Sequence, residues 1–183
     1  FGGDAWRAGI TLFDTRIDGL LDYGMTSLGN KPDEYRSKGF TLNASYDFGN
    51  TRIGGTFTKA DVTAGGVDVL PDNGTYFMPA GEIATLFVDH EIPEHNLKLG
   101  ATMEWAGSLD GFVRGATTYY EQPSYTVVNV YGEWSPRAHE NVSIRLGIDN
   151  LFDRTYFERT SFAPNSGRGG VGRPWALPND PSS

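Results

Sequence analysis

Residues capable of covalent, acid–base or metal chemistry are scarce in this sequence, and they do not converge on one place. The 183-residue chain has no cysteine, which excludes disulfides, zinc fingers and thiol nucleophiles. Its three histidines, His90, His95 and His139, fall at or near short turns predicted below. No nucleophile elbow and no metalloprotease helix is present. We therefore predict no catalytic residue, no metal site and no bound cofactor, and an enzyme is the least favoured class.

Two segments match ligand-binding motifs in letters only. Gly167-x-Gly169-x-x-Gly172 has the spacing of the dinucleotide fingerprint, but no buried strand precedes it and no helix follows it. The acids and glycine of 68–74 lack the spacing of a calcium loop, which leaves weak calcium binding as an alternative to a plain loop. The net charge is −8, and with no basic patch visible the sequence argues against nucleic acid as a partner.

The elements that carry the polar residues are strands with two different faces. In 40–48 every second residue is apolar: Phe40, Leu42, Ala44, Tyr46 and Phe48. The same alternation returns in 97–105 and 142–149. Because successive side chains of a strand point to opposite faces, each strand presents one apolar and one polar face. No apolar run approaches the roughly 20 residues of a spanning helix, so a helical membrane protein is excluded.

Short and long connections alternate between these strands. Strands are predicted at 4–22, 35–48, 51–61, 81–92, 96–106, 124–134 and 141–150. Short turns at 49–50, 93–95 and 135–140 fall at one end, and long loops at 23–34, 62–80, 107–123 and beyond 151 fall at the other. Aromatic residues gather at both ends: Trp6, Tyr46, Phe48 and Trp134 near the short turns, and Trp105 and Phe152 near the long loops. In outer-membrane barrels the short turns are periplasmic and the long loops extracellular.

The first predicted strand contains a change of phase. Its apolar positions change parity between Leu12 and Phe13. This shift indicates either a β-bulge or the point at which the strand leaves the membrane.

The pattern predicts an all-β fold, an antiparallel up-and-down transmembrane β-barrel segment. Two alternatives remain open. A small, complete outer-membrane barrel of about eight strands, acting as an adhesin or anchor, would need 173–177 to pair with the first strand. A soluble β-sandwich binding module would instead bury the apolar face in its interior.

One segment carries a family resemblance. Asn150-Leu151-Phe152-Asp153-x-x-Tyr156 resembles the Asn-Leu-Phe-Asp-x-x-Tyr segment near the C-terminus of TonB-dependent outer-membrane receptors, and 125–129 and 36–40 resemble earlier strands of that family in the same order. We expect Asn150 and Asp153 to bond the backbone where strand pairing ends. Leu151, Phe152 and Tyr156 are expected to pack at the membrane border.

The resemblance covers 1–168 and implies the C-terminal portion of a receptor barrel. It implies about seven or eight strands of a barrel of about 22, with no plug domain in this chain. The tail 169–183 departs from the family: it is rich in Gly and Pro, and Pro is a poor member of a central strand. We interpret the tail as a truncated or replaced last strand.

The resemblance also implies a function, which is the uptake of an iron complex, a ferric siderophore or haem, across the bacterial outer membrane. Energy would come from the TonB complex, contacted through an N-terminal region missing from this sequence, and outer-membrane lipid would surround the barrel. Loop residues suited to an anionic iron complex are Tyr76, Arg114, Tyr119, Tyr120, Arg154, Arg159 and Arg168. Because the histidines fall at the other end, an axial ligand for haem would be a loop tyrosine, Tyr76, Tyr119, Tyr120 or Tyr156, or would come from sequence outside this chain. The alternative for these tyrosines is an interfacial anchor.

Overall fold

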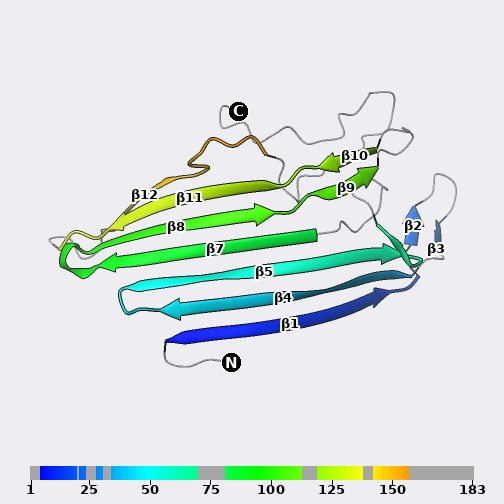
Figure 1. The fold of residues 1–183 in the computed structure, drawn as a ribbon, viewed down its shortest axis with the longest axis horizontal. Coiled ribbons are helices and arrows are strands. Elements are labelled where there is room, and N and C mark those ends of the chain that lie inside the picture. The colour runs from blue at the N-terminus through cyan, green and yellow to red at the C-terminus, as the bar shows by residue number, and fades with distance from the viewer. Residues whose placement is uncertain are drawn as a thin grey trace.

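The computed structural model describes residues 5–19, 21–23, 28–30, 34–69, 81–112, 119–137 and 142–156. Within them a path of seven strands forms one antiparallel sheet whose spatial order follows the chain (Figure 1). Their bounds are β1 (Trp6–Ile17), β4 (Tyr35–Asp47), β5 (Thr51–Ala64), β7 (Gly81–Ile92), β8 (Leu97–Ala106), β11 (Tyr125–Trp134) and β12 (Ile144–Ile148). The predicted all-β, up-and-down antiparallel fold is confirmed.

Segments predicted as loops contain further strands. β3 (Leu28–Asn30) pairs with β2 (Leu21–Tyr23), most of which falls in the predicted strand 4–22, and β9 (Leu109–Phe112) pairs with β10 (Tyr119–Gln122). The short β6 (Val67–Asp68) pairs with the end of β5. The prediction of 23–34, 62–80 and 107–123 as loops without strands is therefore wrong in these parts, because strands of two to four residues are too short to show an alternating pattern.

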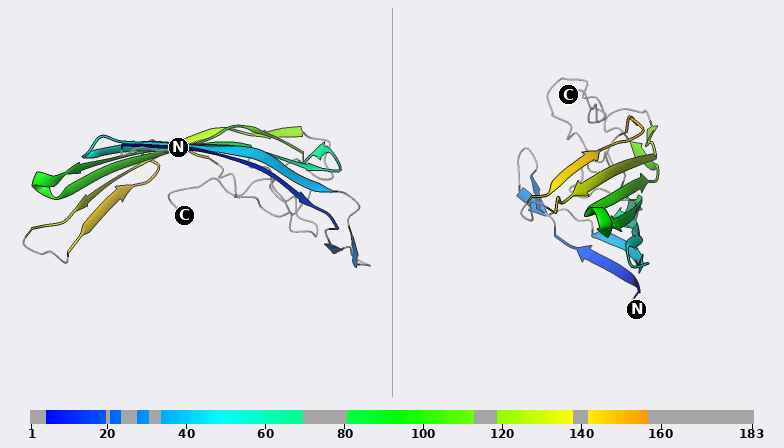
Figure 2. Two further views of the ribbon diagram at one scale, coloured as in Figure 1. Left: turned by 90° about the horizontal axis from the view of Figure 1, so that it is seen from below. Right: turned by 90° about the vertical axis from the view of Figure 1, so that its left-hand side faces the viewer.

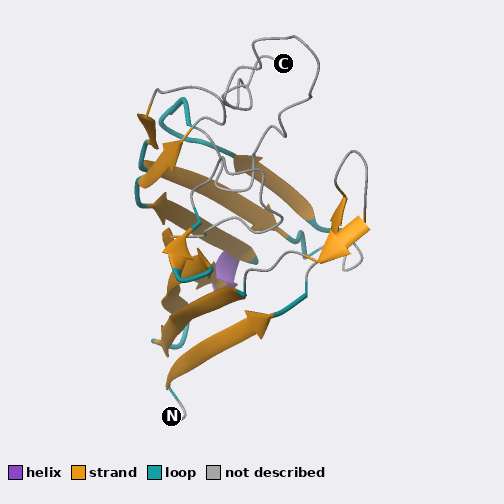
Figure 3. Cartoon of the chain, turned by 90° about the vertical axis from the view of Figure 1, so that its right-hand side faces the viewer, coloured by secondary structure: helices purple, strands orange, loops and turns teal. Residues whose placement is uncertain are grey.

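The predicted short turns join neighbouring strands at one end of the sheet. At Gly49, whose φ of 86° favours glycine, the backbone N–H donates to Asp47 Oδ1 at 2.8 Å. The next turn is a 3₁₀ turn, η1 (Pro93–His95), closed by Asn96 in the left-handed region with φ 49°. Figure 3 shows η1 in purple at the far end of the sheet.

The predicted β-bulge in the first strand is wrong. β1 pairs with β4 without interruption from Trp6 opposite Tyr46 to Ile17 opposite Tyr35. The apolar face ends at Leu12, and the next residue on that face is Asp14, opposite Lys38. The phase shift therefore follows the second interpretation, in which the strand passes from an apolar to a charged environment.

The sheet is arched rather than flat (Figure 2). Among the described residues β1 and β12 form its two edges and do not pair with each other, so the sheet is an open wall. The proposed pairing of 173–177 with the first strand falls outside the described residues. No helix in the described part of the chain is long and apolar enough to cross a bilayer.

One face of the wall, called the outward face below, is a continuous apolar surface. Its cross-strand rows are set by the register: one row runs from Trp6 through Tyr46, Ile53, Val88, Ala101 and Val130 to Ile148. Large apolar side chains on this face are exposed, up to 75% for Leu12 and Leu146. A soluble sandwich would bury this face, and an apolar surface of this extent fits contact with lipid.

Aromatic side chains lie where the sequence places them on the outward face. Trp6 and Tyr46 are direct cross-strand partners near the short turns, and the Tyr46 and Phe48 rings lie 4.4 Å apart. Trp134 stands at the same end, 47% exposed, and Phe152 is 63% exposed near the long loops. Such belts mark the two membrane–water interfaces.

Candidate functional site

The opposite, inward face is polar and changes character along the strands. Near the short turns it is charged, in the middle it carries hydroxyl and amide groups, and near the long loops it is apolar and aromatic. We call these the charged zone, the hydroxyl zone and the loop-base clusters. Together they form one side of a water-facing passage in a barrel wall.

The charged zone joins the last four strands of the path through opposite charges. Glu133 of β11 lies opposite Lys98 of β8 and opposite Arg145 of β12. Arg145 Nη1 approaches Glu133 Oε2 at 3.9 Å, and Lys98 Nζ approaches Asp89 Oδ2 at 3.8 Å. The Ser143 hydroxyl donates to Glu133 at 3.0 Å. Each cation of this group thus has a carboxylate close by, and the zone is internally balanced.

Tyr131 is the centre of the charged zone. Its hydroxyl donates to Asp89 across β8, and the Arg145 guanidinium lies 4.0 Å from its ring centroid. The residue between Tyr131 and Asp89 in the register is Gly100. A Cβ at this position would overlap the Tyr131 ring, so glycine is required for the tyrosine to reach its acceptor.

A second aromatic side chain crosses a glycine beside this zone. A Cβ on Gly54 would lie 2.7 Å from the Phe87 ring, and the Arg52 guanidinium lies 5.4 Å from the centroid of the same ring. Aromatic rings laid over glycines of the neighbouring strand therefore recur on the inward face, where they cover backbone that would otherwise face water.

The hydroxyl zone consists of uncharged cross-strand pairs. Thr41 and Thr58 hydroxyls lie 3.0 Å apart, and Thr56 and Thr85 hydroxyls lie 2.6 Å apart. Asn129 Nδ2 donates to Thr102 at 3.4 Å. Each pair shares one hydrogen bond across neighbouring strands, which contributes to strand pairing, and together the pairs form a neutral polar wall in the middle of the passage.

The two loop-base clusters hold the starts of the long connections. The first joins Tyr35, Val62 and Val69, and the Val69 N–H donates to the Val62 carbonyl at 2.8 Å. The second consists of Ala106, Tyr125 and Val127 with Ile83 and Tyr156 packed against them. In it the Tyr125 hydroxyl donates to Glu104 at 2.7 Å. Loops that leave from packed bases have fixed starting directions.

Beyond the apolar band, outside the membrane-spanning part of the strands, the outward face carries ion pairs. Arg36 donates to Asp14 through Nε at 2.7 Å and through Nη2. At the edge of the band, in the same row as Leu12 and Phe40, Lys59 donates to Glu82 at 3.0 Å. The hydrogen bond from Arg36 holds the pKa of the exposed Asp14 carboxyl below its ordinary value. Charges at this level fit headgroups and water rather than acyl chains.

The motif 150–156 folds as a turn at the end of β12. Asn150 and Asp153 both have positive φ, 51° and 48°. Asn150 Nδ2 donates to the Arg154 carbonyl and Oδ1 accepts from the Arg154 N–H, both at 2.9 Å. Asp153 joins through its backbone N–H, which donates to the Asn150 carbonyl at 2.8 Å. The side chain of Asn150 thus bonds the backbone where pairing ends, as predicted.

The remaining motif residues divide between the two faces. Leu151 and Phe152 are exposed, as expected at the membrane border. Tyr156 instead packs on the inward side, with its ring 4.9 Å from the Tyr125 ring. The expectation that Tyr156 packs at the border is therefore not met, because the turn directs it onto the second loop-base cluster.

Most of the predicted ligand-binding residues lie outside the part of the chain that the structure describes. Tyr76, Arg114, Arg159 and Arg168 are outside the described residues. Tyr119 and Tyr120 are neighbours on β10, opposite Phe112 and Gly111 of β9. Arg154 is exposed and held by its backbone in the Asn150 turn. Among these residues the structure brings together only Tyr119 and Tyr120, which are adjacent in sequence.

His90 and His95 lie at the short-turn end, as predicted. His90 lies in the register opposite Thr51, and His95 lies in η1; His139 is outside the described residues. Sequence reasoning missed the roles of Tyr125, Glu104 and Gly100. The alternation places all three on the inward face, but nothing in it indicates that Tyr125 bonds Glu104 or that Gly100 makes room for an aromatic ring.

Comparison with known proteins identifies the family to which the chain belongs. Residues 1–151 match the family model for the TonB dependent receptor-like β-barrel. The chain therefore belongs to the TonB-dependent receptors and forms part of their β-barrel. These proteins reside in the outer membrane of Gram-negative bacteria, and the family consists of receptors and transporters rather than enzymes.

Individual members of this family resemble the chain in sequence or in fold. It is 57% identical over 176 residues to the heme transporter BhuA of Brucella abortus, covering 96% of this chain and 26% of that protein. The FrpB iron transporter of Neisseria meningitidis has the same fold, with a TM-score of 0.74 and 16% identity over 85% of this chain and 26% of its own. The Fiu ferric-catecholate import receptor of E. coli K12 follows, with a TM-score of 0.62 and 18% identity over 84% and 22%. The chain thus spans about a quarter of the length of the relatives it matches.

Proposed function

We propose that the receptor containing this chain imports haem across the outer membrane, with energy supplied through the TonB complex. The observation that carries the proposal is the 57% identity to a heme transporter over 96% of this chain. The aligned 176 residues make up nearly the whole chain, so the match spans strands that contribute to both the passage and the lipid-facing surface.

We propose further that residues 1–168 are the C-terminal portion of the barrel and that 169–183 are its atypical end. Support comes from the order of the resembling segments, with 36–40 first, 125–129 later and the Asn150 turn last. The passage would then be completed by strands that precede this region.

The three inward zones suit an amphipathic substrate. Haem has an apolar macrocycle and two propionate carboxylates, so it needs apolar contacts where it is captured and polar groups along its path. The loop-base clusters supply apolar contacts near the long loops. The hydroxyl zone supplies polar groups along the path and, being uncharged, creates no strong electric field. The charged zone, whose cations have carboxylates nearby, would not trap a carboxylate at the periplasmic exit.

The test of substrate uses the whole receptor in a strain that lacks it. We expect the restored receptor to support growth on haem as the only iron source and not on a ferric siderophore. A second strain without TonB should fail to grow on haem even when the receptor is present. Growth on the siderophore alone would reassign the substrate, and TonB-independent growth on haem would reject the energy source.

The test of the capture site uses the loop that contains β9 and β10. Tyr119→Phe and Tyr120→Phe remove one hydroxyl each and keep the rings. We expect one of the two to weaken haem binding to the purified receptor and to change the Soret band, because iron ligation needs the phenolic oxygen. Tyr46→Phe, on the outward face near the short turns, is the control that removes a hydroxyl far from the loop. Wild-type spectra for both loop variants would exclude these tyrosines as ligands.

A further inference from the structure

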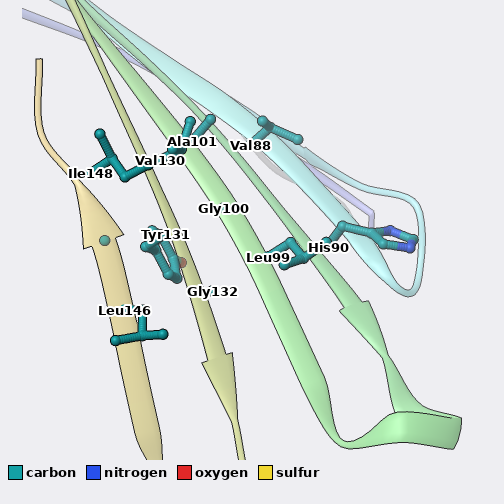
Figure 4. Close-up of a pocket in the computed structure, with 11 residues that line it drawn as sticks. Val88, His90, Leu99, Gly100, Ala101, Val130, Tyr131, Gly132, Leu146 and Ile148 are labelled. Carbon is teal, nitrogen blue, oxygen red and sulfur yellow. The ribbon is translucent and has the colours of Figure 1, made fainter. Parts of the chain in front are cut away.

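A hollow of about 540 Å³ lies on the outward face, over β7, β8, β11 and β12 (Figure 4). Its rim is formed by the side chains of Val88, Leu99, Val130, Leu146 and Ile148. The hollow is separate from the inward passage, and nothing in haem transport requires it. It needs its own explanation.

The hollow exists because two small residues interrupt the apolar rows. Ala101 stands between Val88 and Val130 in one row. Gly132 stands between Leu99 and Leu146 in the next. A Cβ added to Gly132 would lie 3.4 Å from the Leu99 Cδ2, so the backbone does not demand glycine here. The missing side chain leaves room at the surface.

A polar pair lies at the periplasmic border of the hollow. His90 contributes to the lining, and its Nδ1 lies 2.7 Å from the Thr51 hydroxyl. Figure 4 shows the His90 ring directed away from Val130 and Ile148. The next row toward the turns is Leu97 opposite Trp134, so His90 lies at the level of the aromatic belt. When Thr51 donates to Nδ1, the neutral imidazole keeps its proton on Nε2 and can donate from there.

We propose that this hollow binds one acyl chain of a phospholipid in the periplasmic leaflet, with His90 donating a hydrogen bond to its phosphate. The position of the hollow in the membrane suits this ligand. The row of Val130 lies two residues, or about 7 Å, deeper than the row of His90. Because one leaflet has about 15 Å of hydrocarbon, the hollow stays within the periplasmic leaflet. The acyl chain would lie along the hollow, from the headgroup toward the bilayer centre. Since lipid is as apolar as the protein surface, preference comes from van der Waals packing into a shape that fits.

The experiment uses the whole receptor in nanodiscs with phosphatidylglycerol that carries a diazirine in one acyl chain. After illumination, labelled peptides are identified by mass spectrometry. We expect labelling concentrated on peptides from β8 and β11. Gly132→Leu fills the hollow and should remove this labelling. Val128→Leu adds bulk on the same strand and face outside the hollow, and should leave it unchanged. Normal heat-modifiable mobility on gels establishes that each variant is folded.

A second arm separates the headgroup from the chain. His90→Phe keeps an aromatic side chain and removes the donor, so labelling by the phospholipid should fall about tenfold, the equivalent of one hydrogen bond to a charged acceptor. Diacylglycerol with the same diazirine chain has no phosphate, and its labelling should not respond to His90→Phe. The proposal is overturned if Gly132→Leu is labelled like the wild type, if Val128→Leu loses labelling equally, or if His90→Phe affects both lipids alike. None of these outcomes depends on which substrate the receptor transports.

Discussion

The substitution Gly100→Ala tests how the charged zone is built. The added Cβ would overlap the Tyr131 ring, and the ring cannot stay where it is. When it moves, Tyr131 loses the hydrogen bond to Asp89 and its contact with the Arg145 guanidinium. A single methyl group on β8 should therefore disconnect side chains on β7, β11 and β12.

The magnitude follows from these contacts. A hydrogen bond to a charged group contributes about 1.5–3 kcal/mol, and an exposed cation–π contact about 0.5–1 kcal/mol. Replacing glycine by alanine in a strand returns about 0.5–1 kcal/mol. The net loss should be about 1–3.5 kcal/mol in the free energy of unfolding, of which the Tyr131–Asp89 bond supplies the largest part.

The assay is denaturant unfolding of the whole receptor in phospholipid vesicles, followed by tryptophan fluorescence. Gly147→Ala is the matched control, because Gly147 flanks Tyr131 on its other side and its added Cβ would meet the nearest atom, the Val130 carbonyl oxygen, at 3.5 Å. It should be neutral or slightly stabilising. The double variant Gly100→Ala with Tyr131→Ala should show no further loss beyond Tyr131→Ala alone. Equal stability of Gly100→Ala and Gly147→Ala would refute the reasoning.

Three further predictions test the two faces and the end of the wall. Met103→Lys, on the outward face, should destabilise the inserted barrel by about 2–4 kcal/mol, whereas Thr102→Lys, one residue away and inward, should change it by less than half as much; similar losses would reject the assignment of faces. Asn150→Ala removes both side-chain bonds of the turn and should lower the free energy of unfolding by about 1–2 kcal/mol, measured in the same vesicles, whereas an unchanged value would show that the turn forms without its side chain. Arg36 lowers the pKa of Asp14, so the folded state holds the proton of this carboxyl less tightly than the unfolded chain does. The wild type should therefore be slightly more stable than Asp14→Asn above the ordinary aspartate pKa of about 3.9, and this difference should disappear as the pH falls through the lowered pKa. A difference in stability that persists in acid would contradict the ion pair.

The faces of the strands could be predicted from sequence because their cause is local. Period two requires only that the chain be extended, and the change from Leu12 to Asp14 along β1 records a change of surroundings. The same logic placed Trp6, Tyr46 and Trp134 at one border. The alternation also disfavours a slip by one residue, which would turn Leu42 and Leu99 into the passage, but it does not fix which residues pair.

The contacts that organise the passage could not be predicted in this way. Tyr131 and Asp89 are 42 positions apart in sequence, and only the register across β8 brings them together. Gly100 and Gly132 look alike in the sequence, yet one makes room for a ring and the other leaves a hollow. The short β9–β10 hairpin escaped for another reason, since pairing of four residues on each side is set by the loop and not by an alternating pattern.

The contacts within the wall also limit how far this part of the barrel can determine which substrate is transported. The wall is held by backbone pairing and by cross-strand contacts, such as Thr41 with Thr58 and Lys98 with Asp89. Side chains that are uncharged, or whose charge is balanced by a neighbour, can hydrate a path but distinguish little between one ligand and another. Choice of substrate should therefore depend on groups outside the ladder, above all the loops that leave from the bases at Tyr35 and Tyr125. On this reasoning, exchanging the loop tips between two receptors of the family should transfer substrate preference, whereas exchanging the hydroxyl zone should not.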